Sequence, residues 1–148
     1  MIIGTIPSIE IPTIPGVEAP PTSTRFVNRT DLTVRSGASY EILNDTGRGV
    51  LDELMIRSPS RFFSISIVVD TVNEFASTYE DLTSIGQNSP SISAFTELDM
   101  DGSETGFYVV SIRSIPYFAG IRAIMYNDDS LDITYSNIFA KYRIIMTS

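Results

Sequence analysis

The sequence predicts an all-β fold: an antiparallel β-sandwich, jelly-roll-like, of about eight strands with one short helix and an extended N-terminal arm. Three observations lead to this prediction. Residues 63–69 alternate between apolar and other side chains, so that Phe63, Ile65, Ile67 and Val69 share one face of a strand. Short apolar runs recur between turn-forming residues, without long helical patterns between them. Five of the eight prolines lie within the first 21 residues.

The length and composition fit one domain preceded by the arm. The chain has 148 residues, of which 43% are hydrophobic, enough for one substantial core. Near residue 25 the sequence changes from a segment rich in proline and isoleucine to short apolar runs separated by turn residues. We therefore divide the chain into an arm, residues 1–24, and a β-sandwich domain, residues 25–148.

The arm contains the stretch TIPSIEIPTIPGVEAPP, residues 5–21. Each proline lacks a backbone donor and fixes its own φ, so neither a regular helix nor a central strand fits this segment. We predict that its isoleucines are buried against a neighbouring subunit or shell protein, by strand addition or in grooves. An arm that wraps along its own domain is the alternative. The partner-binding residues predicted here are Ile6, Ile9, Ile11 and Ile14.

Short apolar runs separated by turn residues predict the strands of the domain. The expected strands cover residues 32–34, 39–43, 50–58, 63–70, 92–98, 106–113, 121–126, 131–135 and 140–146. The turn at Ser58-Pro59-Ser60 predicts that the strands on either side of it form a hairpin.

One short helix is expected over residues 77–85, ending near Gly86. Ser77-Thr78-Tyr79-Glu80 resembles a capping box, and Phe75, Tyr79 and Leu82 recur at helical spacing. These aromatic residues are interpreted as part of the core rather than as a binding site.

The charge and the missing residue types restrict the function. Eighteen acidic and ten basic residues give a net charge of −8, which disfavours direct contact with nucleic acid. Without a targeting or membrane-spanning run, we expect a soluble, non-secreted chain with no membrane partner. Because His and Cys are absent, the usual general base, metal ligand and thiol nucleophile are missing, and we expect no enzyme activity and no cofactor.

Acidic residues beside turns leave two chemical alternatives. A carboxylate hydrolase would use two of Asp52, Glu53, Asp99 and Asp101 facing one cleft. Residues 99–104 and 127–130 each place acidic residues in a turn, but neither has the full set of oxygen ligands of a calcium loop. We interpret both as turns and predict no metal site.

Binding of a host-surface carbohydrate is the main alternative function. Tyr117 and Phe118 follow Pro116 and precede Ala119-Gly120, so these aromatic rings could form a sugar platform on a loop. Packing of the rings into the domain is favoured over that role. Loss of glycan binding on Tyr117→Ala would support a carbohydrate-binding module.

Two stretches resemble β-sandwich structural proteins of tailed bacteriophages, such as tail, baseplate and head-decoration components. GRGVLDELMIRSPSRFFSISIVVDT, residues 47–71, is similar to a strand-turn-strand pattern in those proteins, with Thr71 where the pattern has glycine. SIPYFAGIRAIMYND, residues 114–128, is similar to a companion strand that begins after a Pro-aromatic pair and ends at Asn127.

This resemblance implies a non-enzymatic virion protein, assembled in the host cytoplasm as a homo-oligomer and in contact with other virion proteins. The positions that carry it are Gly49, Leu51, Leu54, Ile56, Ser58, Phe63, Ile65, Ile67, Val69 and Asp70 in the first stretch, and Pro116, Phe118, Ile121, Ile124 and Asn127 in the second.

Overall fold

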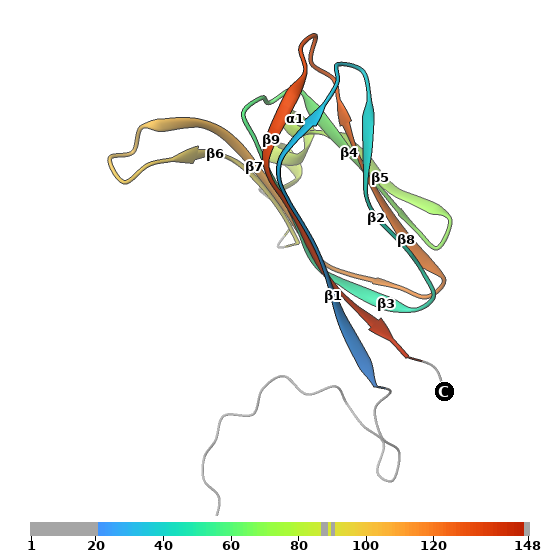
Figure 1. Cartoon of the computed structure of the whole chain (residues 1–148). Helices are drawn as coiled ribbons and strands as arrows, with labels where there is room; N and C mark the ends of the chain where they lie inside the picture. The colour runs from blue at the N-terminus through green and yellow to red at the C-terminus, as the bar shows by residue number, and fades with distance from the viewer. Residues whose placement is uncertain (1–20, 87–88, 90, 147–148) are drawn as a thin grey trace, which may run out of the picture.

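Two antiparallel sheets face each other in the computed structural model, which describes residues 21–86, 89 and 91–146, with only the backbone for residues 73–75 (Figure 1). In spatial order, sheet A consists of β1 (Thr22–Val34), β9 (Ile133–Ile145), β3 (Gly49–Ser58), β7 (Glu104–Tyr117) and β6 (Ile92–Leu98). Sheet B consists of β2 (Ser39–Thr46), β8 (Gly120–Asn127), β4 (Phe63–Val69) and β5 (Val72–Thr78). The helix α1 (Tyr79–Gly86) follows β5. The antiparallel β-sandwich and its short helix are thereby confirmed.

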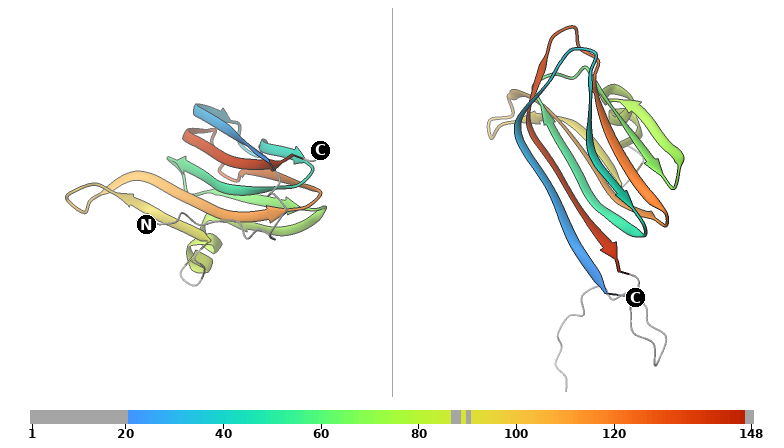
Figure 2. Two further views of the ribbon diagram at one scale, coloured as in Figure 1. Left: turned by 90° about the horizontal axis from the view of Figure 1, so that it is seen from below. Right: turned by 45° about the vertical axis from the view of Figure 1, so that its right-hand side comes forward.

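The strand order is that of a jelly roll. The order β1-β9-β3-β7 in sheet A faces the order β2-β8-β4-β5 in sheet B, and β6 extends sheet A beyond β7. The first strand of the domain therefore pairs with the last, in register from Thr22↔Ile145 to Val34↔Ile133. Figure 2 shows the two sheets from two further directions.

The predicted hairpin of residues 50–58 and 63–70 is wrong, because β3 and β4 belong to opposite sheets. Side chains satisfy backbone groups in the connection: the Ser58 hydroxyl accepts the N–H of Ser60 at 3.0 Å, and the Ser60 hydroxyl accepts that of Phe62 at 3.1 Å. The connection of residues 59–62 therefore leads the chain from sheet A to sheet B. Both strands bury one face in the same core. Alternation alone therefore could not distinguish a hairpin within one sheet from two strands in opposite sheets.

Several strands differ from their predicted limits. β1 begins at Thr22, within the last three residues of the predicted arm, and continues to Val34. β9 is one strand where two were predicted, because β1 pairs with it on both sides of Ser136, and β3 pairs with it from Asn137 onward. Residues 72–78 form β5, which was not predicted. The helix begins at Tyr79, and the Thr78 hydroxyl, not that of Ser77, accepts the N–H of the third helical residue, Asp81, at 3.2 Å.

The core lies between the sheets and includes one side of α1. Phe63, Ile65 and Ile67 are buried together, as the alternation predicted, while Val69 is half-buried. Tyr79 packs its ring 5.7 Å from Phe63, and Leu82 is fully buried, so the interpretation as core is confirmed for these two residues. The side chain of Phe75 lies outside the described part of the structure.

Candidate assembly surface

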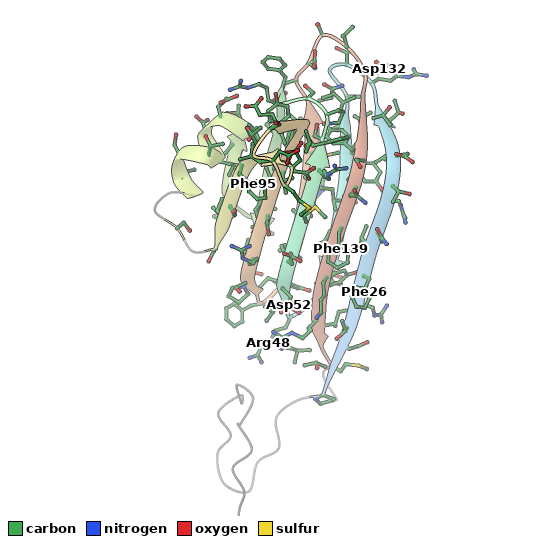
Figure 3. The ribbon with its side chains drawn as sticks, turned by 90° about the vertical axis from the view of Figure 1, so that its left-hand side faces the viewer. Phe26, Arg48, Asp52, Phe95, Asp132 and Phe139 are labelled. Carbon is green, nitrogen blue, oxygen red and sulfur yellow. The ribbon has the colours of Figure 1, made fainter. Side chains whose placement is uncertain are left out.

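An apolar band crosses the outer face of sheet A. Successive side chains of a strand point to opposite faces, so Met55 beside buried Leu54 and Val109 beside buried Val110 face away from the core, although Val109 is only 9% exposed. The band consists of Phe95 on β6, Val109 on β7, Met55 on β3, Phe139 on β9 and Phe26 on β1. Phe26, Phe95 and Phe139 are labelled on this face in Figure 3.

Cross-strand pairing brings members of the band together in two groups, because between β7 and β3 Val109 is opposite Arg57 and Met55 is opposite Ser111. Phe95 is opposite Val109, Met55 is opposite Phe139, and the rings of Phe26 and Phe139 lie 6.2 Å apart. Phe26 and Phe95, at the two ends of the band, are 62% and 47% exposed. Exposed apolar side chains on one sheet face make this face a candidate contact surface.

Two arginines beside the band are held in ion pairs. Arg57 contacts Glu97 through two hydrogen bonds of 2.8 Å, and its guanidinium lies 3.6 Å from the centre of the Phe107 ring. The Arg57 hydrogen bonds lower the pKa of Glu97 to about 2. Arg143 contacts both carboxylate oxygens of Asp52 on the same face (Figure 3). An apolar centre bordered by paired charges is typical of a protein interface.

The hairpin of β6 and β7 projects from the sandwich on the side of sheet A's outer face (Figure 1). Leu98 is 57% exposed and Met100 at the tip is fully exposed. The Asp99 carboxylate accepts the N–H groups of Asp101 and Ser103 at 2.9 and 3.0 Å, which closes the turn. The hairpin therefore presents apolar side chains on a turn that is fixed by its own hydrogen bonds.

Three of the four carboxylates considered for a hydrolase, those of Asp52, Glu53 and Asp99, are engaged in other contacts. Asp52 pairs with Arg143, and Glu53 accepts a 3.2 Å hydrogen bond from the Ser111 hydroxyl. Asp99 and Asp101 lie at the tip of the projecting hairpin. Within residues 21–86, 89 and 91–146, no three acidic side chains converge as a metal site would require. The four arm isoleucines predicted to bind partners lie outside the described residues.

The second acidic turn, residues 127–130, is also fixed by internal hydrogen bonds. Buried Asn127 donates its amide to the carbonyls of Val34 and Leu131 at 2.9 and 3.0 Å. Asp129 accepts the Ser60 hydroxyl at 2.7 Å, and this bond lowers the pKa of its carboxyl group. These bonds hold three connections together at one end of the sandwich.

Sequence reasoning missed a pair of carboxylates at the opposite end. Asp45 and Asp70 line one cavity of about 220 Å³, together with Arg122. Asp70 accepts three backbone N–H groups from residues 118–120, and Asp45 accepts the Tyr117 hydroxyl at 2.6 Å. Both carboxylates therefore support turns.

The predicted aromatic pair has two different environments. Tyr117 is 1% exposed, and its burial together with Asp45 raises the pKa of the phenol. Phe118 is 69% exposed, with the Arg48 guanidinium 5.7 Å from its ring centre. Only Phe118 could contact a sugar, so the glycan test belongs to this residue rather than to Tyr117.

No protein-family model matches the chain, and a search of curated proteins gave no match either. Among the described residues, no helix has the length and apolar character needed to cross a membrane.

Proposed function

We propose that this protein is a non-enzymatic structural component of a virion that assembles on a bacteriophage particle, as a head-decoration, neck, tail or baseplate protein. It assembles with itself and with other virion proteins in the host cytoplasm, and its N-terminal arm contacts neighbouring subunits. The observation that carries the proposal is the apolar band from Phe95 to Phe26 on the outer face of sheet A.

The strand order supports this function without deciding it. Jelly rolls build viral capsid domains but also lectins and cupins, so the fold has to be combined with the surface. The chain lacks the His and Cys residues on which most catalytic and metal sites depend. The bacteriophage assignment depends on the resemblance of residues 47–71 and 114–128 to tailed-phage structural proteins.

The energetics favour covering the band in an assembly. Complete burial of one large apolar side chain contributes roughly 1.5–3 kcal/mol. For Phe26 and Phe95, much of this free energy can still be gained at an interface, because both side chains are exposed in the single chain. A specific interface of ordinary size buries about 800 Å² on each partner.

Sedimentation velocity of the full chain tests the assembly surface. We expect Phe26→Ser combined with Phe139→Ser to abolish concentration-dependent assembly while the melting temperature stays close to that of the wild type. Phe118→Ser is the matched control, because Phe118 is 69% exposed but lies in the β7–β8 turn. Assembly that survives the double substitution, or a wild-type chain that stays monomeric at every concentration, would contradict the proposal.

Removal of residues 1–20 tests the arm separately. Because β1 begins at Thr22, this deletion leaves every described strand intact. We expect the shortened chain to keep the β content of the wild type by circular dichroism but to assemble poorly. Failure to fold would show that the arm belongs to its own domain's core, and normal assembly would show that it contacts no neighbour.

Binding of a carbohydrate remains the second candidate function, because Phe118 exposes its ring beside Arg48. Exposed loop positions often carry binding residues, and the Arg48 guanidinium would supply hydrogen-bond donors to sugar hydroxyl groups. Binding to a glycan array that is lost in Phe118→Ala and retained in Phe26→Ser would favour this function.

A further inference from the structure

The start of β1 presents an open sheet edge with different chemistry on its two faces. β1 is the terminal strand of sheet A, with β9 on one side and no strand on the other among the described residues. Val27 packs against the core, so Arg25 and Arg29 lie on its side of the strand, while Phe26 lies on the outer side. An exposed edge without proline or lysine is a ready template for another strand.

Unpaired positive charge is concentrated around this edge. Arg25, Arg29, Arg48 and Lys141 form no ion pair with any residue in the described part of the chain, although the chain as a whole carries a charge of −8. Phe26 is paired with Lys141 across β1 and β9, and Arg25 and Arg48 line one shallow cavity of about 300 Å³. The edge therefore suits an extended segment that is both apolar and acidic.

The N-terminal twenty residues contain such a segment. They include Glu10 and Glu18 but no Lys or Arg. Ser8-Ile9-Glu10-Ile11 lies between Pro7 and Pro12, so these four consecutive residues keep their backbone donors between two positions that interrupt a ladder. In an extended conformation Ile9 and Ile11 share one face and Glu10 occupies the other.

We propose that residues 8–11 of one copy add as a short strand to the open edge of β1 in a second copy. Ile9 and Ile11 then lie beside Phe26 and extend the apolar band, while Glu10 on the opposite face lies between Arg25 and Arg29. The inference builds on the proposed function, which requires assembly, and identifies both the arm residues and the surface that receives them. Strand addition of this kind gains affinity from the backbone and specificity from the alternating side chains.

A second copy is favoured over the chain's own β1 by the residues in between. Four of the ten residues that separate Ile11 from Thr22 are prolines: Pro12, Pro15, Pro20 and Pro21. Proline and the residue before it favour extended backbone, which opposes the reversal that pairing with the same β1 requires. Ten extended residues reach about 35 Å, enough to cross to an adjacent subunit.

Charge reversal in the full chain tests the pairing by sedimentation velocity. We expect Glu10→Arg, and separately Arg25→Glu with Arg29→Glu, to raise the concentration at half-assembly about tenfold or more, because like charges replace opposite ones. Glu18→Arg and Arg35→Glu are matched controls that make the same changes of charge outside the proposed pair, because Arg35 follows the end of β1 and forms no ion pair among the described residues. Both are expected to assemble like the wild type, and circular dichroism checks that each variant is folded.

Mixing the two defective variants distinguishes the second copy from the same copy. In an equimolar mixture, each arm finds a receiving edge of opposite charge only on the other variant, so assembly should return to the wild-type concentration. A mixture that stays defective overturns exchange between copies. A wild type that assembles but is insensitive to every charge reversal overturns this inference alone, whereas a wild type that never assembles overturns the proposed function with it.

Discussion

The Asp70 carboxylate accepts the backbone N–H of Ala119 at a distance of 2.6 Å. The N–H groups of Phe118 and Gly120 point to the same carboxylate, and the N–H of Asp70 donates to the carbonyl of Gly120 at 2.9 Å. Asp70 and Thr71 have φ values of 52° and 67°, so a two-residue turn with positive φ links β4 to β5. Asp70 thereby joins this turn to the one between β7 and β8.

We predict that Asp70→Asn destabilises the protein in a pH-dependent way. The hydrogen bond from Ala119, followed by those from Gly120 and Phe118, lowers the pKa of Asp70 in the folded state. Its contribution is therefore complete above the unfolded pKa of about 3.9 and is lost as the pH falls through the lower folded value. Urea unfolding should give the wild type a higher free energy of unfolding than Asp70→Asn at pH 7. This difference should shrink below about pH 4.

Asp101→Asn is the control for this experiment, because the Asp101 carboxylate accepts no hydrogen bond within the described residues. The difference in free energy of unfolding between wild type and Asp70→Asn could instead stay constant across the acid range. That result would show that the amide disrupts the turn by its shape and not by its lack of charge.

Two neighbouring residues of β4 should differ strongly in their tolerance of substitution. Ile67 is fully buried between the sheets, so Ile67→Ala should cost about 2–5 kcal/mol in the free energy of unfolding, and Ile67→Asp should prevent folding. Ser66 faces the other side and is only 8% exposed, but Ser66→Ala removes a single oxygen atom, so it should change the free energy of unfolding by less than about 1.5 kcal/mol. Urea unfolding measures both, and equal losses would place Ser66 in a second core.

Gly49→Ala should destabilise the start of β3. A Cβ at this position would lie 2.4 Å from both the Arg143 carbonyl oxygen and the Tyr117 hydroxyl. Because one of these atoms belongs to the backbone of a paired strand, we expect a loss of about 2–3 kcal/mol by urea unfolding. Val50→Ala, one residue later and half-buried, should lose less than about 1 kcal/mol. Equal stability of Gly49→Ala and wild type would show that β9 can move away.

Calcium should leave the melting temperature unchanged within about 1 °C, as should a chelator, because a calcium site needs six or more converging oxygens. In the turn at the hairpin tip, Asp99 already accepts two backbone N–H groups. Differential scanning fluorimetry with calcium and with EGTA checks this. A stabilisation of several degrees that disappears in Asp99→Asn would reveal a calcium site at this turn.

Local pattern predicted the existence of most strands but not their partners. Alternation showed which side of Phe63 and Ile67 faces the core, because that depends only on neighbouring residues. It could not show that β3 and β4 lie across the sandwich, since both arrangements bury the same faces. Helical spacing from Phe75 to Leu82 concealed β5, because Phe75 pairs with Ile67 in a strand while Leu82 belongs to the helix.

The apolar band was predictable only in part. An outward-facing Met55 between two core residues, and an outward Phe139 beside Ala140, were available signals in single strands. The band itself depends on Phe26 and Phe139 coming together, which requires the pairing of the first and last strands. No local sequence window contains that information.

The same pairing determines when the chain can fold. β9 lies between β1 and β3, so during synthesis sheet A lacks a central strand until residues 133–145 have left the ribosome. Contacts between distant parts of a chain slow folding, and strands that wait for their partners are prone to aggregate. Phe139 arrives with this last strand, so a prematurely terminated chain can neither close its sheet nor present a complete outer face. The sheet and its outer face are therefore completed in the same step.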